Sequence, residues 1–244
     1  MLGGVRARPS TRTLTLRISS AVYDRPYEFP NRGPVTWPCP VRAPSRAGSS
    51  VTEAARPLRV VFVCTANISR SPYAERRASQ LAHPDAAIEF TSAGIPGHPG
   101  RPMDDQMAAI LRDQGGSPEG HVSRSLNWWI LATADLVLTF EFAQHMRILD
   151  AWPDQDVKVM GLLQFVDAAE RLGTVVPGIT EPPTSQPRAV PTWVAEAASL
   201  ARPNSMTRDI ADPYRRGAKA ARECAAQIDD ALARVLPLLV NGRS

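Results

Sequence analysis

Residues 60–72 read VVFVCTANISRSP, and this stretch decides the fold. The run from Arg59 to Val63 is rich in β-branched and aromatic residues, which is typical of a buried parallel strand. A short loop leads to Pro72, a residue that is well tolerated in the first turn of a helix. A strand, a short loop and a helix in direct succession predict one unit of a parallel α/β sheet.

The same alternation of strand-like and helical patterns continues along the chain, and it favours a parallel sheet with helices on both faces. The closing helix has apolar residues at three- and four-residue steps, which predicts one buried stripe. Cys224 belongs to this stripe, so we expect it to be a core residue. The remaining expected strands are 88–92, 135–139 and 157–160, and the remaining expected helices are 104–111, 142–149, one ending near 172 and one from 216 to 239.

Two segments do not follow this alternation. Residues 1–57 are rich in Pro, Arg, Ser and Thr and show weak periodicity, so we expect a largely disordered N-terminal extension. A tail without function, a targeting peptide and a start site assigned too far upstream all explain it, and the first and third are favoured. The folded domain is expected to span 58–244 and to contain a Pro-rich insertion at about 173–209, with one helix at 192–200.

The composition excludes several classes of protein. The chain has 43% hydrophobic and 21% charged residues, as ordinary globular proteins do, and no apolar run approaches the roughly 20 residues of a membrane span. The positive charge lies in the first 57 residues, and the remainder shows no basic stripe with aromatic residues, so neither a membrane nor a nucleic-acid partner is expected. Cys39, Cys64 and Cys224 are too widely spaced for a disulfide framework, which suits the cytoplasm.

Cys64 stands where the first strand ends, and Arg70 and Ser71 follow where the helix begins. The loop between them can curl so that its backbone N–H groups and the positive end of the helix surround a phosphate. The same field favours the thiolate form of Cys64. Arg70 can hold two phosphate oxygens through its planar guanidinium, and the Ser71 hydroxyl can donate to the sulfur. The predicted phosphate-binding residues are Thr65, Ala66, Asn67, Ile68, Ser69, Arg70 and Ser71.

Cleavage of a phosphate ester also needs an acid that protonates the leaving oxygen. The chain has a single Asp-Pro pair, Asp212-Pro213, shortly before the last helix. Pro213 stiffens this loop and keeps Asp212 out of the helix. An isolated Asp-Pro pair usually marks a turn or a helix cap, but together with the Cys64 loop we interpret Asp212 as the acid.

These motifs resemble those of the low-molecular-weight protein tyrosine phosphatases. The resemblance implies a three-layer α/β fold with a four-stranded parallel sheet and helices on both faces. It also implies Cys64 as nucleophile, Arg70 as phosphate clamp, Ser71 as partner of the thiolate, and Asp212 as acid and then base, while Asn67 would brace the loop by hydrogen bonds. The resemblance covers about 58–172 and 205–240, and its motifs are residues 63–72, 91–94, 100–104, 134–138 and 212–214.

The chain departs from the family pattern in the loop and at the rim of the expected site. Ala66 stands where the family usually has Gly, so the loop must accept a methyl group, and Ser69 stands where many members have a second Cys. Arg215 replaces the second aromatic residue after Asp-Pro, which leaves Tyr214 at the substrate rim. The aromatic residue often found near 97–98 is absent, and His98 is expected to approach the rim.

We therefore expect a phosphatase that acts on a phosphotyrosine-containing protein or a small aryl phosphate. The four histidines are expected mostly on loops or helix surfaces and lack metal-ligand spacing, so neither a metal nor a cofactor is expected. The oligomeric state stays open. The alternatives are an arsenate reductase on the same fold, which would need further cysteines, a phosphate-binding module without turnover, and a sugar-transport component that carries phospho-Cys.

Overall fold

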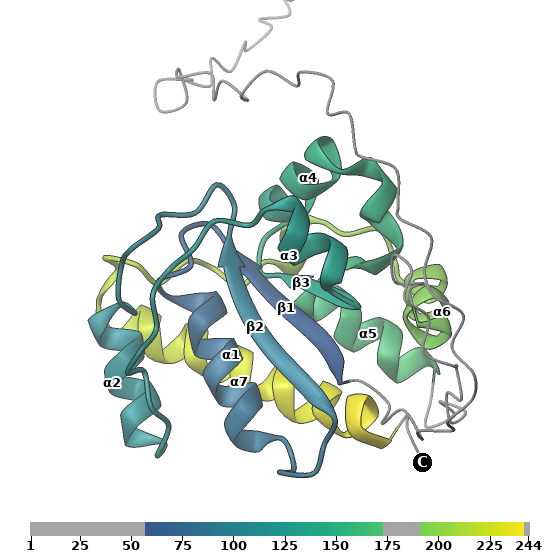
Figure 1. Cartoon of the computed structure of the whole chain (residues 1–244). Coiled ribbons are helices and arrows are strands. Elements are labelled where there is room, and N and C mark those ends of the chain that lie inside the picture. The colour runs from purple at the N-terminus through teal and green to yellow at the C-terminus, as the bar shows by residue number, and fades with distance from the viewer. Residues whose placement is uncertain (1–56, 173–190, 242–244) are drawn as a thin grey trace, which may run out of the picture. The chain divides into compact units, whose positions relative to one another are not determined.

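The computed structural model describes residues 57–172 and 191–241 (Figure 1). The expected extension, apart from residue 57, and residues 173–190 of the expected insertion lie outside the described residues. The strands are β1 (Leu58–Cys64), β2 (Ile88–Gly94), β3 (Leu136–Thr139) and β4 (Val159–Gly161). The helices are α1 (Arg70–Leu81), α2 (Asp105–Asp113), α3 (Trp128–Thr133), α4 (Phe142–Ala151), α5 (Leu162–Leu172), α6 (Thr192–Leu200) and α7 (Gly217–Asn241), with 3₁₀-helices η1 (Pro153–Lys158) and η2 (Met206–Arg208).

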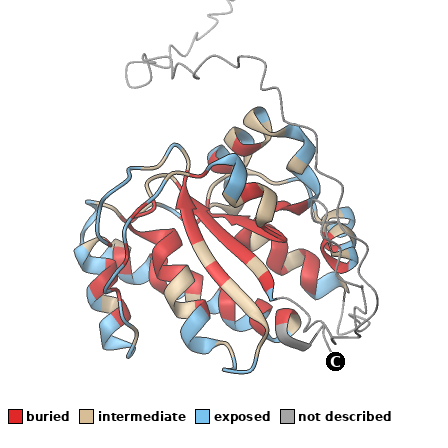
Figure 2. Cartoon of the chain, viewed as in Figure 1, coloured by how far each residue is buried: buried red, intermediate tan, exposed pale blue. Residues whose placement is uncertain are grey.

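The four strands form one parallel sheet in the order β2-β1-β3-β4. As an inner strand, β1 pairs on both sides, so that Val60 lies opposite Phe90 of β2 and Leu136 of β3. Helices cover both faces of this sheet (Figure 1), which confirms the three-layer α/β fold. Figure 2 shows that β1 is buried along nearly all its length, as its β-branched composition predicts.

Alternate residues of β1 face opposite layers of helices. Val60 and Phe62 belong to an apolar cluster that contains residues of α1, α2, α5, α6 and α7. Val61 and Val63 belong to a second cluster with residues of α3 and α4. Because both faces are covered, the strand has apolar residues at consecutive positions rather than at every second one.

The long helix α7 packs against α1 and α2 in the first cluster. Cys224 is 4% exposed, which confirms its expected place in the core. The predicted helix at 192–200 is also confirmed, as α6. Within the described residues, no helix combines the length and the apolar character that crossing a membrane requires. The predicted stripe of α7 is buried throughout and comprises Ala221, Cys224, Ile228, Leu232, Val235 and Leu239.

The sequence-based assignment places the start of one strand too early and omits one helix, α3. The first half of the predicted strand 157–160 belongs to η1, and β4 begins only at Val159. Lys158 is buried there, and its ammonium donates to the carbonyl oxygens of Leu131 and Ala134 over 2.7 and 3.2 Å. Burial lowers the pKa of this ammonium. These carbonyl groups lie at the end of α3, a six-residue helix too short for a detectable periodicity.

Candidate active site

The loop after β1 lies at the carboxyl ends of the parallel strands, where ligands bind in open α/β sheets. Its peptide carbonyl groups are held by donors from the segment between β2 and α2. Because the C=O and N–H groups of a trans peptide point in opposite directions, the loop N–H groups face the other side. Such a ring of N–H groups suits an anion. The carbonyl oxygens of Cys64, Thr65, Ala66 and Ile68 accept from the N–H groups of Ile95, Gly97, His98 and Asp104 over 2.6 to 3.2 Å.

The close approach of β2 to this loop requires a glycine at its end. A methyl group on Gly94 would lie 2.7 Å from the Cα atom of Gly97 and 2.9 Å from the carbonyl carbon of Ala66. Ala66 itself fits the loop without backbone strain, because among the described non-glycine residues only Asn67 and Arg215 have a positive φ. The methyl group at position 66 is therefore accepted.

Asn67 ties the loop to three neighbouring segments. Its φ of 58° is left-handed, a conformation that Asn adopts more readily than most residues. The side-chain amide donates to the hydroxyl oxygens of Ser71 and Ser92 over 3.0 and 2.8 Å. The side-chain oxygen Oδ1 of Asn67 accepts from the Arg124 N–H over 2.9 Å. Asn67 is fully buried, so these bonds hold the curve of the loop without competition from water.

Two hydrogen-bonding groups, the Asn67 N–H and the Ser71 hydroxyl, lie close to the Cys64 sulfur. Its side chain is 2% exposed, and the Asn67 N–H donates to the sulfur over 3.3 Å. The Ser71 hydroxyl oxygen lies 3.1 Å from the sulfur and 3.2 Å from the carbonyl oxygen of Ala93. Since Ser71 accepts from Asn67, its own proton is free to serve these two acceptors. This arrangement stabilises negative charge on the sulfur.

Arg70 is 1% exposed, and its guanidinium joins two acidic residues. One terminal nitrogen lies 3.0 Å from Glu141 Oε2 and donates to the Ile210 carbonyl oxygen over 2.9 Å, and the other lies 3.0 Å from Asp212 Oδ2. Burial acts to lower the pKa of Arg70, but the charges of Cys64, Asp212 and Glu141 outweigh it and hold this pKa above its ordinary value. The buried Nε atom has no hydrogen-bond partner among the described residues.

The segment before α7 brings Asp212 to the loop. The Asp212 carboxylate accepts from the Tyr214 N–H over 3.2 Å, which is an Asx turn. A further turn follows, closed by the Arg216 N–H and the Pro213 carbonyl oxygen over 2.9 Å. The second oxygen of Asp212 reaches Arg70. Because the side chain of Asp212 is 40% exposed, the carboxylate also stays open to the pocket.

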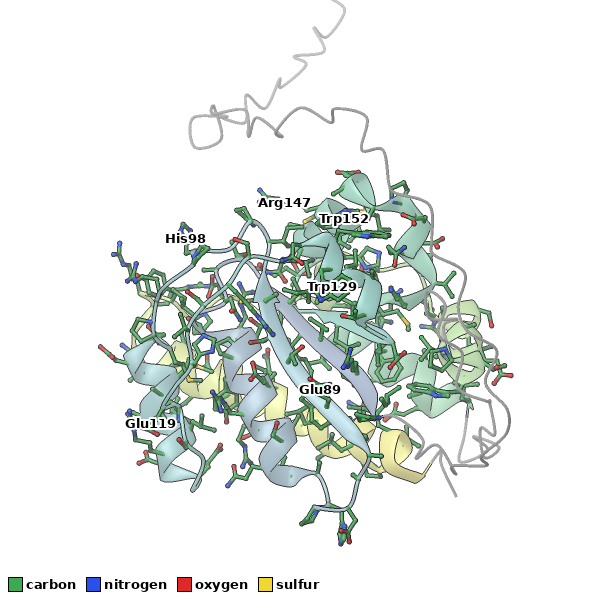
Figure 3. All side chains as sticks on the ribbon, in the orientation of Figure 1. Glu89, His98, Glu119, Trp129, Arg147 and Trp152 are labelled. Carbon is green, nitrogen blue, oxygen red and sulfur yellow. The ribbon has the colours of Figure 1, made fainter. Side chains whose placement is uncertain are left out.

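A pocket of about 280 Å³ opens over Cys64. It brings the predicted rim residues His98 and Tyr214 together with Asp212, and Figure 3 shows His98 projecting from the loop after β2. The predicted residues Asn67, Arg70 and Ser71 do not line this pocket, because they are buried behind the loop. The lining residues are Cys64, Thr65, Ala66, Ile68, Ser69, His98, Arg101, Asp212, Tyr214 and Arg215.

Three residues that contact the loop or Arg70 were not predicted from the sequence. Glu141 pairs with Arg70, as described above, and Gln144 Nε2 donates to the Thr65 hydroxyl over 3.0 Å. Glu141 and Gln144 form a capping box at the start of α4, a pattern that locates a helix end but no contact with another segment. His121 lies in a loop, as expected, but it is buried, with Nε2 2.8 Å from the Asn67 carbonyl oxygen.

Within residues 57–172 and 191–241, no group of three or more His, Cys, Asp or Glu side chains is placed to hold a metal ion.

Known proteins are similar in sequence to the segment that carries the loop. A family model described as low molecular weight phosphotyrosine protein phosphatase matches residues 59–182. The low molecular weight protein-tyrosine-phosphatase Wzb of Escherichia coli (strain K12) is 34% identical over 101 residues, which are 41% of this chain and 67% of that protein. The low molecular weight protein-tyrosine phosphatase A of Mycobacterium tuberculosis (strain ATCC 25618 / H37Rv) is 38% identical over 113 residues, with coverages of 45% and 68%. Asp212 lies outside the residues that the family model matches.

Solved structures share the fold. The YwlE arginine phosphatase from Geobacillus stearothermophilus has a TM-score of 0.56 and 22% identity, and the match covers 75% of this chain and 93% of that one. Vibrio vulnificus Wzb in complex with benzylphosphonate has a TM-score of 0.53 and 22% identity, with coverages of 74% and 98%. At such identities the likeness confirms the architecture of sheet and helices.

Proposed function

The chain belongs to the low molecular weight phosphotyrosine protein phosphatase family and is a cysteine-based phosphatase, and we propose that it hydrolyses phosphotyrosine or a similar aryl phosphate through phospho-Cys64. The observation that carries this proposal is the meeting of two distant segments, the loop after β1 and the segment before α7, at one pocket. Cys64 and Asp212 line the pocket, and Arg70 pairs with Asp212 from behind the loop.

In the first step, the Cys64 thiolate attacks phosphorus, so that an S–P bond forms and the bond from phosphorus to the aryl oxygen breaks. Protonated Asp212 gives its proton to the departing oxygen. Arg70 binds phosphoryl oxygens as the charge moves, and its buried Nε atom, which lacks a partner among the described residues, supports this role. The loop N–H groups contribute in the same way.

In the second step, a water molecule attacks the phosphorus of phospho-Cys64. Asp212, now a carboxylate, takes a proton from this water, the S–P bond breaks, and inorganic phosphate leaves. The Cys64 thiolate is then the leaving group. The Ser71 hydroxyl, 3.1 Å from the sulfur, stabilises it by donating a hydrogen bond.

The walls of the pocket favour an aromatic leaving group. Ile68 and Tyr214 line it beside the polar loop, and an aromatic ring packs well against such side chains. The phosphate of a tyrosine side chain would then reach the loop while its ring lies between these walls. We infer that the substrate is a phosphotyrosine-containing protein or a small aryl phosphate.

We further propose that residues 58–244 are the phosphatase domain, with an insertion at about 173–209, and that residues 1–57 are dispensable for activity. The loop of residues 64–71 and the segment of residues 212–215, which meet at the pocket, both lie within the proposed domain. Cys64 and Cys224 are both free thiols, as is usual in the cytoplasm, where we expect the enzyme to act.

The first test is the hydrolysis of para-nitrophenyl phosphate without added metal, by the full chain and by residues 58–244. We expect equal turnover from both. Cys64→Ser should abolish turnover but keep phosphate binding, because a serine hydroxyl is too weakly acidic to attack at neutral pH. Cys224→Ala is the matched control and should retain turnover, since Cys224 lies in the core of α7.

Turnover by Cys64→Ser would overturn the mechanism. A higher kcat/KM for a phosphoarginine peptide than for the corresponding phosphotyrosine peptide would retain the cysteine chemistry but overturn the proposed substrate.

The second test concerns the acid. Asp212→Asn should lower kcat/KM for a phenolic leaving group of high pKa by roughly 10²- to 10⁴-fold, because an amide N–H is too weakly acidic to protonate the departing oxygen. The loss should shrink for leaving groups of low pKa, such as para-nitrophenol. An equal loss for every leaving group would remove Asp212 from this role.

A further inference from the structure

The rim of the pocket carries more positive charge than the phosphate site uses. Arg101 and Arg215 both line the pocket, from segments that are far apart in the sequence, and both are exposed. The carboxylate that lines the same pocket, Asp212, already pairs with Arg70. Among the described residues, none forms an ion pair with either rim guanidinium.

The backbone holds Arg215 in a defined position. Its φ of 60° is left-handed, an uncommon conformation for a residue with a branched or long side chain. The turn is closed by the Arg216 N–H and the Pro213 carbonyl oxygen, and the Arg215 guanidinium carbon lies 5.1 Å from the centre of the Tyr214 ring. A cation held over an aromatic face is already partly ordered before a ligand binds.

Arg101 is anchored through its main chain. Its N–H donates to the Ser123 hydroxyl over 2.8 Å, and its carbonyl oxygen accepts from the Ser123 N–H over 2.8 Å. The buried Ser123 also donates to the carbonyl oxygen of His98, on the same rim. The backbone at Arg101 is thus fixed while its guanidinium remains available to a ligand.

We propose that Arg101 and Arg215 select phosphopeptides with acidic side chains beside the phosphorylated residue. This inference rests on the proposed function. The loop meets the phosphate at the floor of the pocket, so the two rim guanidinium groups face the residues that flank the phosphorylated side chain. A guanidinium group pairs with a carboxylate through two parallel N–H···O bonds between opposite charges. A Gln side chain is neutral and cannot form this charged pair.

The experiment compares two phosphotyrosine peptides of equal length, one with Asp and Glu around the phosphotyrosine and one with Asn and Gln in their place. The measured quantity is the ratio of their kcat/KM values. We expect the intact enzyme to prefer the acidic peptide, with the difference mainly in KM. Arg101→Gln and Arg215→Gln should each lower the ratio by about two- to five-fold, the worth of an exposed ion pair, and together they should bring it close to one.

Two features separate this role from a general structural one. Added salt should lower the ratio for the intact enzyme and leave it unchanged for the double variant, because exposed charges are screened. Arg222→Gln is the matched control: Arg222 is exposed on α7 and does not line the pocket, so the ratio should not change.

Equal kcat/KM values for the two peptides with the intact enzyme would overturn the inference and leave the proposed function standing. The inference would also be overturned if the rim variants lowered the kcat/KM values of both peptides by the same factor. Failure to hydrolyse either peptide or para-nitrophenyl phosphate would instead overturn the proposed function.

Discussion

Cys64 and Cys224 are almost equally buried, at 2% and 4% exposure, yet their surroundings differ. Cys64 ends a strand, and its sulfur lies among the Asn67 N–H, the Ser71 hydroxyl and an open pocket. Cys224 lies in the apolar stripe of α7. Burial raises the pKa of the Cys224 thiol to about 12. This thiol therefore stays protonated near pH 7.

Burial alone therefore does not decide the reactivity of a cysteine. Donors directed at a sulfur stabilise its thiolate, whereas an apolar shell keeps the thiol protonated. The contrast also bears on arsenate reduction, which needs a second cysteine that can become a thiolate. Cys224 does not meet this requirement, because its thiol stays protonated in the core.

The largest expected difference between the two cysteines is in alkylation. With iodoacetamide at pH 7, Cys64 should be modified with loss of activity, while Cys224 should remain unmodified in the folded protein. The reason is that the thiolate is the reactive form and that, of these two cysteines, Cys64 lines the pocket and Cys224 does not. Peptide mapping by mass spectrometry reads the two sites separately.

Inorganic phosphate provides the control, because it should protect Cys64 by occupying the loop. Unfolding the protein in denaturant should make Cys224 reactive. If Cys224 were modified as fast as Cys64 in the folded enzyme, the comparison would fail.

A smaller effect on activity is expected when Cys64 is kept but the hydrogen bonds that hold the loop are removed. Asn67→Ala removes three side-chain hydrogen bonds, to Ser71, Ser92 and Arg124, and leaves buried polar groups without partners. We expect the free energy of unfolding to fall by about 4–5 kcal/mol, at roughly 1 kcal/mol for each bond plus about 1–2 kcal/mol for a left-handed Ala. Turnover should fall by about 10- to 100-fold, because a small misplacement of the reacting groups lowers the rate by such a factor. Urea denaturation and steady-state kinetics measure the two effects.

Asn67→Gly separates the two contributions, because Gly accepts the positive φ but also lacks the amide. It should be more stable than Asn67→Ala by about 1 kcal/mol while losing similar turnover. A fully active Asn67→Ala enzyme would show that the curve of the loop does not depend on these bonds.

Much of this protein was predictable from sequence because the decisive contacts are local. The strand, the loop and the helix of residues 58–81 are adjacent in the chain, and the bonds from Asn67 and Ser71 to Cys64 span a few residues. The burial of β1 followed from its β-branched run, and the stripe of α7 followed from its periodicity. Such patterns record which side chains avoid water, and they need no knowledge of other segments.

The tertiary structure alone decided which distant groups reach the loop. Asp212 was suggested by Pro213, but Glu141 lies equally close to Arg70, and its capping box indicates only the start of a helix. No local pattern indicates that His121 is buried against the backbone carbonyl oxygen of Asn67, and the motif at 100–104 does not by itself place the Arg101 guanidinium on the pocket rim. These contacts depend on how the helices and loops pack at the carboxyl ends of the strands, and a sequence pattern records burial and periodicity within one segment but not the distance between two.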